Sequence, residues 1–189
     1  YIRSFGFGQR SGIELPAETR GLLKPPKRRN PTTIGSIPMG QEIGVTPIQV
    51  ATMVSTIANG GVYLPPHILL KSSGETNGGK LAPAAFHPEH ELVDPLPVGA
   101  HRVISTLSAA EMRKMMEGVV QYGTGIPAQL NGYSAAGKTG TAQKIDPLTH
   151  TYSKTKYVAS FVGFAPVNDP AITVVVVMDS PAYQFHYGT

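Results

Sequence analysis

Two segments of the chain repeat apolar residues at the spacing of an α-helix. The first reads TPIQVATMVSTIANGG, and its repeating apolar positions are Val50, Met53, Val54, Ile57 and Ala58. Thr46 is a favourable N-cap, Pro47 suits the first helical position, and Gln49 completes a capping box. Asn59 and the two glycines after it supply a stop signal. The pattern predicts a helix that starts after Thr46 and ends before Asn59.

The second helical segment reads SAAEMRKMMEGVVQYG and starts at Ser108. Ser108 and Glu111 form another capping box, and Gly123 ends the segment. The apolar stripe of this helix consists of Met112, Met115, Met116, Val119 and Val120. Three methionines would also suit an adaptable binding groove, but the spacing favours a face that packs in the core.

Towards the end of the chain the pattern becomes that of β-strands. Residues 157–167 carry apolar side chains on both faces, and residues 171–181 contain a continuous β-branched run. A strand without polar alternation is expected to be covered on both faces. Asn-Asp-Pro at 168–170 is a tight-turn signal. Together with YSAAGKTGTAQK (133–144), these strands form a predicted three-stranded meander with helices on both faces.

The remaining segments are predicted to be loops with short pieces of structure. Residues 1–45 are rich in Gly, Pro and charge, and residues 62–104 look extended or irregular, with an exposed hairpin or loop at 71–80. The chain has 189 residues, of which 41% are hydrophobic. It therefore suits one domain of the α/β (α+β) class, in which helices flank an antiparallel sheet.

Charge and composition exclude several classes of function. The net charge is +4, and the only dense basic run, KPPKRRN (24–30), contains two prolines and no aromatic residue. We expect a solvated loop there, with contact to an anion or a membrane surface as the alternative, and no nucleic-acid partner. The absence of cysteine excludes disulfides, a thiolate nucleophile and Cys-ligated metals. The longest aliphatic run, 172–178, is shorter than the roughly 20 residues of a membrane helix.

The candidate chemistry lies in the run Lys138, Thr139, Gly140 and Thr141. This run is either an ordinary turn that contains a lysine or an edge strand that holds an anionic substrate. In a strand, Lys138 faces away from Thr139, while Thr139 and Thr141 share a face. Two hydroxyl groups on one face can bind a carboxylate, and the lysine adds positive potential. Gly140 lacks the Cβ that would obstruct a substrate, and an edge N–H can donate to a developing oxyanion.

The run is also part of a longer series of sequence blocks. These are FGFGQRSGIELPAE, MGQEIGVTPIQVATMVSTIANGG, YGTG, AGKTGTAQK, SFVGFAP and DSP, in that order. Over nearly the whole chain, the series resembles the C-terminal half of the transpeptidase domain of class B penicillin-binding proteins. Lys-Thr-Gly is a motif of penicillin-binding proteins and of class A β-lactamases. The resemblance implies the fold of that superfamily and a serine D,D-transpeptidase. Such an enzyme cross-links peptidoglycan stem peptides through an acyl-enzyme and is acylated by β-lactams.

The resemblance also implies roles for individual residues. Lys138 would help to position the acid/base network and attract the substrate carboxylate. The hydroxyls of Thr139 and Thr141 would bind that carboxylate, and the Thr141 N–H would be one oxyanion donor. No cofactor and no metal is implied. The implied partners are the stem peptide, β-lactam antibiotics and other cell-wall synthesis proteins. They would meet the protein at the outer face of the cytoplasmic membrane, where the full-length protein is expected to be anchored.

Two motifs of this family do not occur in the 189 residues. There is no Ser-x-Asn, and the only Ser-x-x-Lys is SKTK (153–156), which follows the Lys-Thr-Gly run and is expected in a hairpin. We therefore reject Ser153 as a nucleophile, because the family carries that motif earlier, on a helix. Residues 1–189 are expected to be the C-terminal part of one transpeptidase domain. Its N-terminal half and closing helix would lie outside this chain, which would be inactive alone.

Two further interpretations stay open: a β-lactamase or β-lactam sensor of the same fold, and a non-catalytic module for envelope assembly. A metal site at HPEHE (87–91) is disfavoured, because its histidines are three residues apart and Pro88 does not suit a helix interior. Asp146 and Asp179 are expected to be a turn residue and a strand-end residue rather than a pair of carboxylates.

Overall fold

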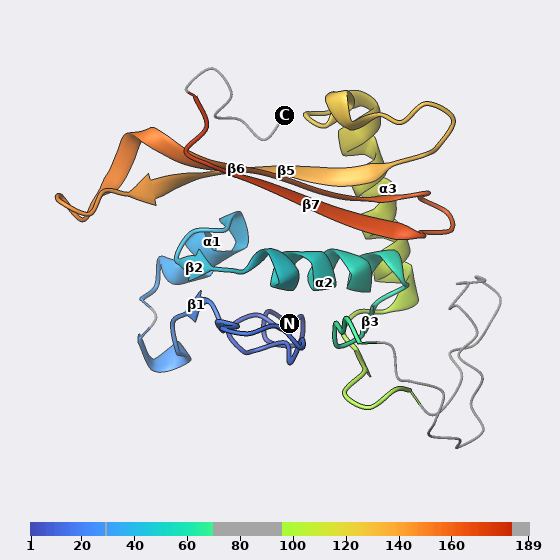
Figure 1. The fold of residues 1–189 in the computed structure, drawn as a ribbon, viewed down its shortest axis with the longest axis horizontal. Coiled ribbons are helices and arrows are strands. Elements are labelled where there is room, and N and C mark those ends of the chain that lie inside the picture. Colours follow the sequence, from blue (N-terminus) through green and yellow to red (C-terminus); the bar gives the residue numbers. More distant parts are fainter. Residues whose placement is uncertain (29, 70–95, 183–189) are drawn as a thin grey trace.

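A three-stranded antiparallel sheet and two α-helices form the body of the computed structural model, which describes residues 1–28, 30–69 and 96–182 (Figure 1). The strands are β5 (Ala136–Ile145), β6 (Tyr152–Ala165) and β7 (Ile172–Asp179), side by side in that order. The helices are α2 (Pro47–Ala58) and α3 (Thr106–Tyr122). The structure confirms the predicted meander and the mixed class with an antiparallel sheet.

Where the structure describes them, the segments outside this body contain only short elements, as predicted for the loop-rich regions. They are β1 (Leu22–Leu23), η1 (Pro26–Arg28), α1 (Thr33–Ser36), η2 (Ile37–Met39), β2 (Ile43–Gly44), β3 (Val62–Tyr63), β4 (His101–Arg102) and η3 (Ile126–Ala128). Strand β1 pairs with β2, and β3 pairs with β4, both antiparallel. The predicted loop at 71–80 and the His87–Glu91 segment lie outside the described residues.

Helix α2 has the predicted bounds and caps. Thr46 Oγ1 accepts from the Gln49 N–H at 3.2 Å, and Gln49 Oε1 accepts from the Thr46 N–H at 3.0 Å, which completes the capping box. The Gln49 side chain is buried, and its Nε2 donates to the carbonyls of Gly6, Gln9 and Arg20. One side chain thus starts the helix and also ties the N-terminal loops to it. The capping pattern alone does not reveal this second role.

Helix α3 starts earlier than predicted. Its N-cap is Ser105, whose Oγ accepts from the Ser108 N–H at 3.0 Å, so Ser108 lies in the first turn instead of at the cap. The methionine face is only partly buried, since Met112 and Met115 are 38% and 58% exposed. The prediction that the whole stripe packs in the core is therefore wrong. The buried residues of α3 are Ala109, Met116, Gly118 and Val120.

One face of the sheet forms the core together with both helices. The core residues are Val54, Ile57, Ala58, Met116, Ala136, Val162, Phe164 and Val167. Ala136 on β5 pairs with Phe164 on β6, and Val162 lies two residues before Phe164 on the same face. Helix α2 lies along this face, and α3 lies beside β5 (Figure 1). The start of β5 is therefore anchored in the best-buried part of the molecule.

The other face of β7 is exposed in the described structure. Ile172, Val174, Val176 and Met178 alternate along it and are 47–60% exposed, whereas Val175 packs against the core. Among the described residues, α2 packs against β6 and β7 on one face of the sheet, and the main sheet contact of α3 is with β5. We expect much of the cover for the exposed face to come from the N-terminal half and the closing helix outside these 189 residues, so the expectation of two covered faces stays a prediction.

Strands β5 and β6 form a long hairpin, because β6 starts at Tyr152 instead of Tyr157. Asp146 occupies the turn, as predicted, and its carboxylate accepts from two backbone N–H groups there. Ser153 lies in β6, where its Oγ accepts from two backbone N–H groups just after it. It is thus a strand residue of a hairpin, which agrees with its rejection as a nucleophile.

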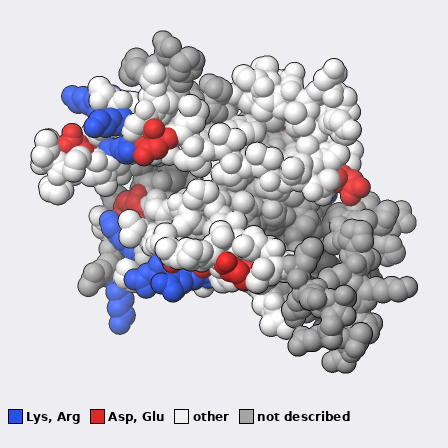
Figure 2. Space-filling view, in the orientation of Figure 1, with Lys and Arg blue, Asp and Glu red and all other residues white. Residues whose placement is uncertain are grey.

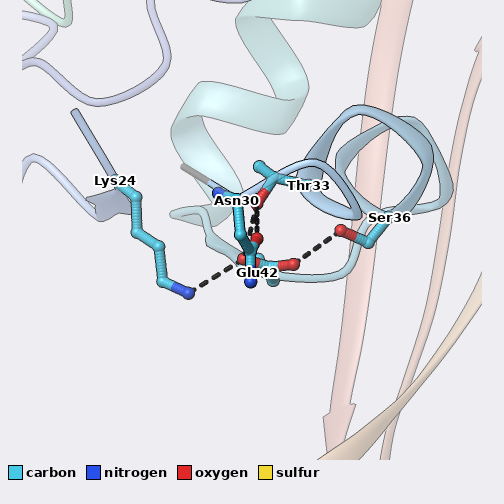
Figure 3. Close-up of polar contacts among 5 residues, drawn as sticks. All are labelled: Lys24, Asn30, Thr33, Ser36 and Glu42. Carbon is cyan, nitrogen blue, oxygen red and sulfur yellow. Dashed lines mark hydrogen bonds and ion pairs between the residues drawn. The ribbon is translucent and has the colours of Figure 1, made fainter. Parts of the chain in front are cut away.

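A polar cluster holds the segment between β1 and β2 (Figure 3). The Glu42 carboxylate accepts from Lys24 Nζ at 2.8 Å, from Ser36 Oγ at 2.6 Å and from Thr33 Oγ1 at 3.3 Å. Asn30 Oδ1 lies closer to the Thr33 hydroxyl than Glu42 does, so the two acceptors compete for its single proton. These bonds, the one from Lys24 above all, hold the pKa of Glu42 below its ordinary value. Lys24, the first residue of the basic run, is therefore engaged within the protein.

Charged side chains on the face drawn in Figure 2 lie mainly over the β5–β6 hairpin and the N-terminal segment, where both signs occur. Among the described residues, none of the helices combines the length and hydrophobicity that a bilayer-spanning segment needs. Within the same part of the chain, no His, Asp and Glu residues are grouped so that they could hold a metal ion.

Candidate functional site

The run Lys138–Thr141 lies in β5, which is an edge strand of the three-stranded sheet. Lys138 and Thr141 are exposed, and Thr139 and Gly140 are partly buried. The register pairs Thr139 with Phe161 and Thr141 with Ala159, so the two threonines share a face. The structure confirms the edge strand and excludes the alternative of an ordinary turn.

The residues just before this run fix its position. Ala136 is 1% exposed in the core, and Gly137 pairs with Gly163 on β6. A Cβ added to Gly137 would overlap the ring of Phe161 and would lie 2.9 Å from the Val162 carbonyl oxygen. The Phe161 ring thus occupies the space that glycine leaves, and β5 lies close against β6. Lys138 therefore projects from a backbone that has little freedom to move.

The ammonium group of Lys138 has only neutral partners in the described structure. Its Nζ donates to the Thr139 carbonyl at 2.7 Å and lies 3.5 Å from the Thr139 hydroxyl. Two ion pairs form among the described residues, and neither involves Lys138. Strand alternation directs Lys138 and Thr139 to opposite faces, as predicted. The long lysine side chain nevertheless bends towards Thr139, the next residue of the strand. Its charge is therefore brought beside the Thr139 hydroxyl.

Lys144, further along the same strand, has a different environment. Its Nζ lies 2.5 Å from Asp179 Oδ1 and 3.1 Å from Ser180 Oγ. The hydrogen bond from Lys144, followed by that from Ser180, lowers the pKa of the Asp179 carboxyl. Asp179 ends β7, as predicted, and the ion pair joins the ends of β5 and β7. Among the described residues, Lys144 thus has an acidic partner and Lys138 has none.

Thr139 has a hydroxyl partner that sequence reasoning missed. Thr124 Oγ1 lies 2.9 Å from Thr139 Oγ1. Thr124 belongs to the Tyr-Gly-Thr-Gly block directly after α3 and is exposed. The block was a signal of family resemblance, but no local pattern indicates that its threonine meets β5.

Gly140 has a structural role that the sequence did not indicate. A Cβ at this position would lie 2.5 Å from the hydroxyl oxygen of Ser160, the residue opposite it on β6. The Ser160 hydroxyl in turn lies 3.5 Å from the Gly140 carbonyl oxygen. A side chain at this position would therefore require the Ser160 hydroxyl to rotate away.

Comparisons with known proteins cover the whole chain. Residues 1–189 match the family model of the penicillin-binding protein transpeptidase domain. Penicillin-binding protein PbpB of Mycolicibacterium smegmatis is 38% identical over 187 residues, which are 95% of this chain and 27% of that protein. Stage V sporulation protein D of Bacillus subtilis is 35% identical over 197 residues, with 100% of this chain and 27% of that protein covered. The chain thus spans about a quarter of the length of these relatives.

The fold has a close counterpart among solved structures. The crystal structure of penicillin-binding protein 3 from Mycobacterium tuberculosis, complexed with ampicillin, matches with a TM-score of 0.79 and 35% identity. The match covers 95% of this chain and 38% of that chain. The sheet and helices described above therefore have the arrangement found in part of that protein.

Proposed function

Since the chain belongs to the penicillin-binding protein transpeptidase family, we propose that it forms the carboxylate-binding wall of a serine D,D-transpeptidase. This enzyme cross-links peptidoglycan stem peptides. A serine outside these 189 residues attacks the carbonyl carbon before the terminal D-alanine, which leaves with its amine. An amine of a second stem peptide then displaces the serine from the acyl-enzyme. β-Lactams acylate the same serine.

The observation that carries this proposal is the exposed ammonium of Lys138, which has only neutral partners and lies 3.5 Å from the Thr139 hydroxyl. A cation without an acidic partner leaves its charge available to an anion, and a charge-assisted hydrogen bond is stronger than a neutral one. The C-terminal carboxylate of a stem peptide, or the carboxylate of a β-lactam, supplies that anion. Lys138 and the hydroxyls of Thr139 and Thr141 bind this carboxylate.

The backbone of β5 also takes part in the proposed site, as a hydrogen-bond donor to the oxyanion. Edge strands present backbone groups to an added extended segment. The Thr141 N–H is proposed as one donor to the oxyanion that forms during acylation, with the nucleophile's own N–H as the other. Gly140 allows the substrate backbone to approach. Lys138 also helps to position the acid/base network around the serine.

The nucleophilic serine lies outside residues 1–189, because this sequence lacks Ser-x-Asn and its only Ser-x-x-Lys lies on β6. The intact protein accordingly also contains the N-terminal half of the same domain and a closing helix. It is placed at the outer face of the cytoplasmic membrane by an anchor, beside other cell-wall synthesis proteins.

The experiment that tests the function uses the intact protein. With a fluorescent penicillin it should form a long-lived covalent adduct, and with stem peptides it should produce cross-linked dimers. Rapid turnover of nitrocefin would instead favour a β-lactamase of the same fold. An adduct without any cross-linking would favour a β-lactam sensor, and the absence of an adduct would favour an assembly module.

A further inference from the structure

Thr124 is placed beside Thr139 by the end of α3. The Gly125 N–H donates to the Val119 carbonyl at 2.8 Å, and Gly125 itself is buried. Val120, in the last turn of α3, is 2% exposed. The loop that carries Thr124 is therefore attached to the buried part of the helix.

The glycines on either side of Thr124 keep this loop close to the helix. A Cβ on Gly123 would lie 2.9 Å from Val119 Cα, and one on Gly125 would lie 3.1 Å from the Val119 carbonyl oxygen. Gln129 Nε2 also donates to two carbonyls of the last helical turn, at 3.1 and 3.2 Å. The position of Thr124 is thus set by the helix end, and its contact with Thr139 follows from that position.

In the contact between the Thr124 and Thr139 hydroxyls, each hydroxyl has only one proton that it can donate. A threonine hydroxyl donates one hydrogen bond and accepts two. The Thr139 hydroxyl has two donors in reach, Thr124 Oγ1 at 2.9 Å and Lys138 Nζ at 3.5 Å. When these groups donate to it, its own proton remains for a ligand. If Thr139 donated to Thr124 instead, it would have no proton left for a carboxylate.

We propose that Thr124 is a positioning residue that donates to Thr139 and so directs the Thr139 proton at the ligand carboxylate. The inference rests on the proposed function, in which Thr139 binds that carboxylate. A chain of hydrogen bonds from Thr124 through Thr139 to an anion polarises each member and strengthens the last bond. A ligand without the negative charge is bound only slightly more strongly through this series of hydrogen bonds. Thr124 therefore contributes to selectivity for ligands that end in a carboxylate.

The test measures the second-order rate constant of acylation of the intact protein by benzylpenicillin and by its uncharged methyl ester. Thr124→Val removes the hydroxyl but keeps the shape of the side chain. It should slow acylation by benzylpenicillin about five- to tenfold and by the ester less than about twofold. Thr124→Ser keeps a hydroxyl and should restore most of the rate. In a Thr139→Val background, Thr124→Val should have no further effect.

Three results would overturn the inference alone. The first is a wild-type rate for Thr124→Val while Thr139→Val is slow, and the second is that the effects of the two substitutions simply add. Equal slowing with the acid and the ester would also overturn it, because the effect would not depend on the carboxylate. A Thr139→Val variant that acylates at the wild-type rate would overturn the proposed role of Thr139 in carboxylate binding as well, and wild-type rates for both Thr139→Val and Lys138→Ala would overturn the proposed carboxylate site. Should Thr124→Val fail to fold, Thr124→Ala against Thr124→Ser makes the same comparison, since Thr124 is exposed.

Discussion

The side-chain amide of Gln49 donates to the backbone carbonyl of Gln9, 40 residues earlier in the chain, at 2.9 Å. Gln49 is 2% exposed, and its amide also donates to Gly6 and Arg20 and accepts from Thr46. Among the described residues, no buried side-chain nitrogen or oxygen lacks a hydrogen-bond partner. The Gln49 side chain therefore links α2 to three carbonyls of the N-terminal loops, in addition to the packing of Phe5 against the core.

Gln49→Glu should destabilise the protein by about 3 kcal/mol or more, because the donors become acceptors and a buried charge would face three carbonyls. The free energy of unfolding of the intact protein, from urea denaturation, checks this. Gln129→Glu is the matched control, since Gln129 also donates to two carbonyls but is exposed. It should cost less than about 1 kcal/mol. Equal effects of the two substitutions would show that Gln49 does not hold the loops.

The two glycines of β5 should differ sharply in their tolerance of alanine. Gly137→Ala forces a Cβ against the Phe161 ring and the β6 backbone, and should cost about 2 kcal/mol. Gly140→Ala meets only the Ser160 hydroxyl at short distance, and that group can rotate away, so its cost should stay below about 1 kcal/mol. Thermal unfolding of both variants measures the difference. The account of the β5–β6 packing fails if Gly140→Ala is the more damaging.

The Glu42 cluster should make stability depend on pH. The pKa of Glu42 is lowered in the folded protein, chiefly by the hydrogen bond from Lys24 and then by that from Ser36. A lowered pKa means that the ionised carboxylate stabilises the fold above the unfolded-state pKa, and that this contribution is lost as pH falls through the folded-state pKa. Wild type should therefore lose more stability than Glu42→Gln between about pH 6 and about pH 3.

Thermal unfolding of both proteins across this range measures the effect. Lys24→Met should weaken the pH dependence only in part, because the Ser36 hydroxyl still donates to Glu42 at 2.6 Å. Parallel pH profiles for wild type and Glu42→Gln would contradict the assigned role of the cluster.

Local patterns predicted the elements whose signals are complete within a few residues. The capping box and apolar spacing of α2 gave both of its ends, and the β-branched run gave β7. At α3 the same reasoning chose Ser108, because Glu111 three residues later suggested a capping box, whereas the cap is Ser105. The exposure of β7 and of Met115 could not be predicted, since periodicity shows that side chains share a face but not what packs on it.

The candidate site shows the same limit. The Lys-Thr-Gly run and its strand could be predicted from residue types and alternation. The partners of that run could not, because Thr124, Ser160 and Phe161 reach it through tertiary packing. The bend of Lys138 towards Thr139 also depends on side-chain conformation, which strand alternation does not specify.

The most direct test of the central claim is the rate at which the intact protein is acylated by benzylpenicillin after substitution of the carboxylate-binding residues. Lys138→Ala and Thr139→Val should each lower the second-order rate constant at least about tenfold, because each removes a charge-assisted interaction with the ligand carboxylate. Lys144→Ala is the matched control, since that lysine lies on the same strand but is paired with Asp179, and it should acylate at nearly the wild-type rate. Wild-type rates for both Lys138→Ala and Thr139→Val would contradict the claim that β5 binds the carboxylate.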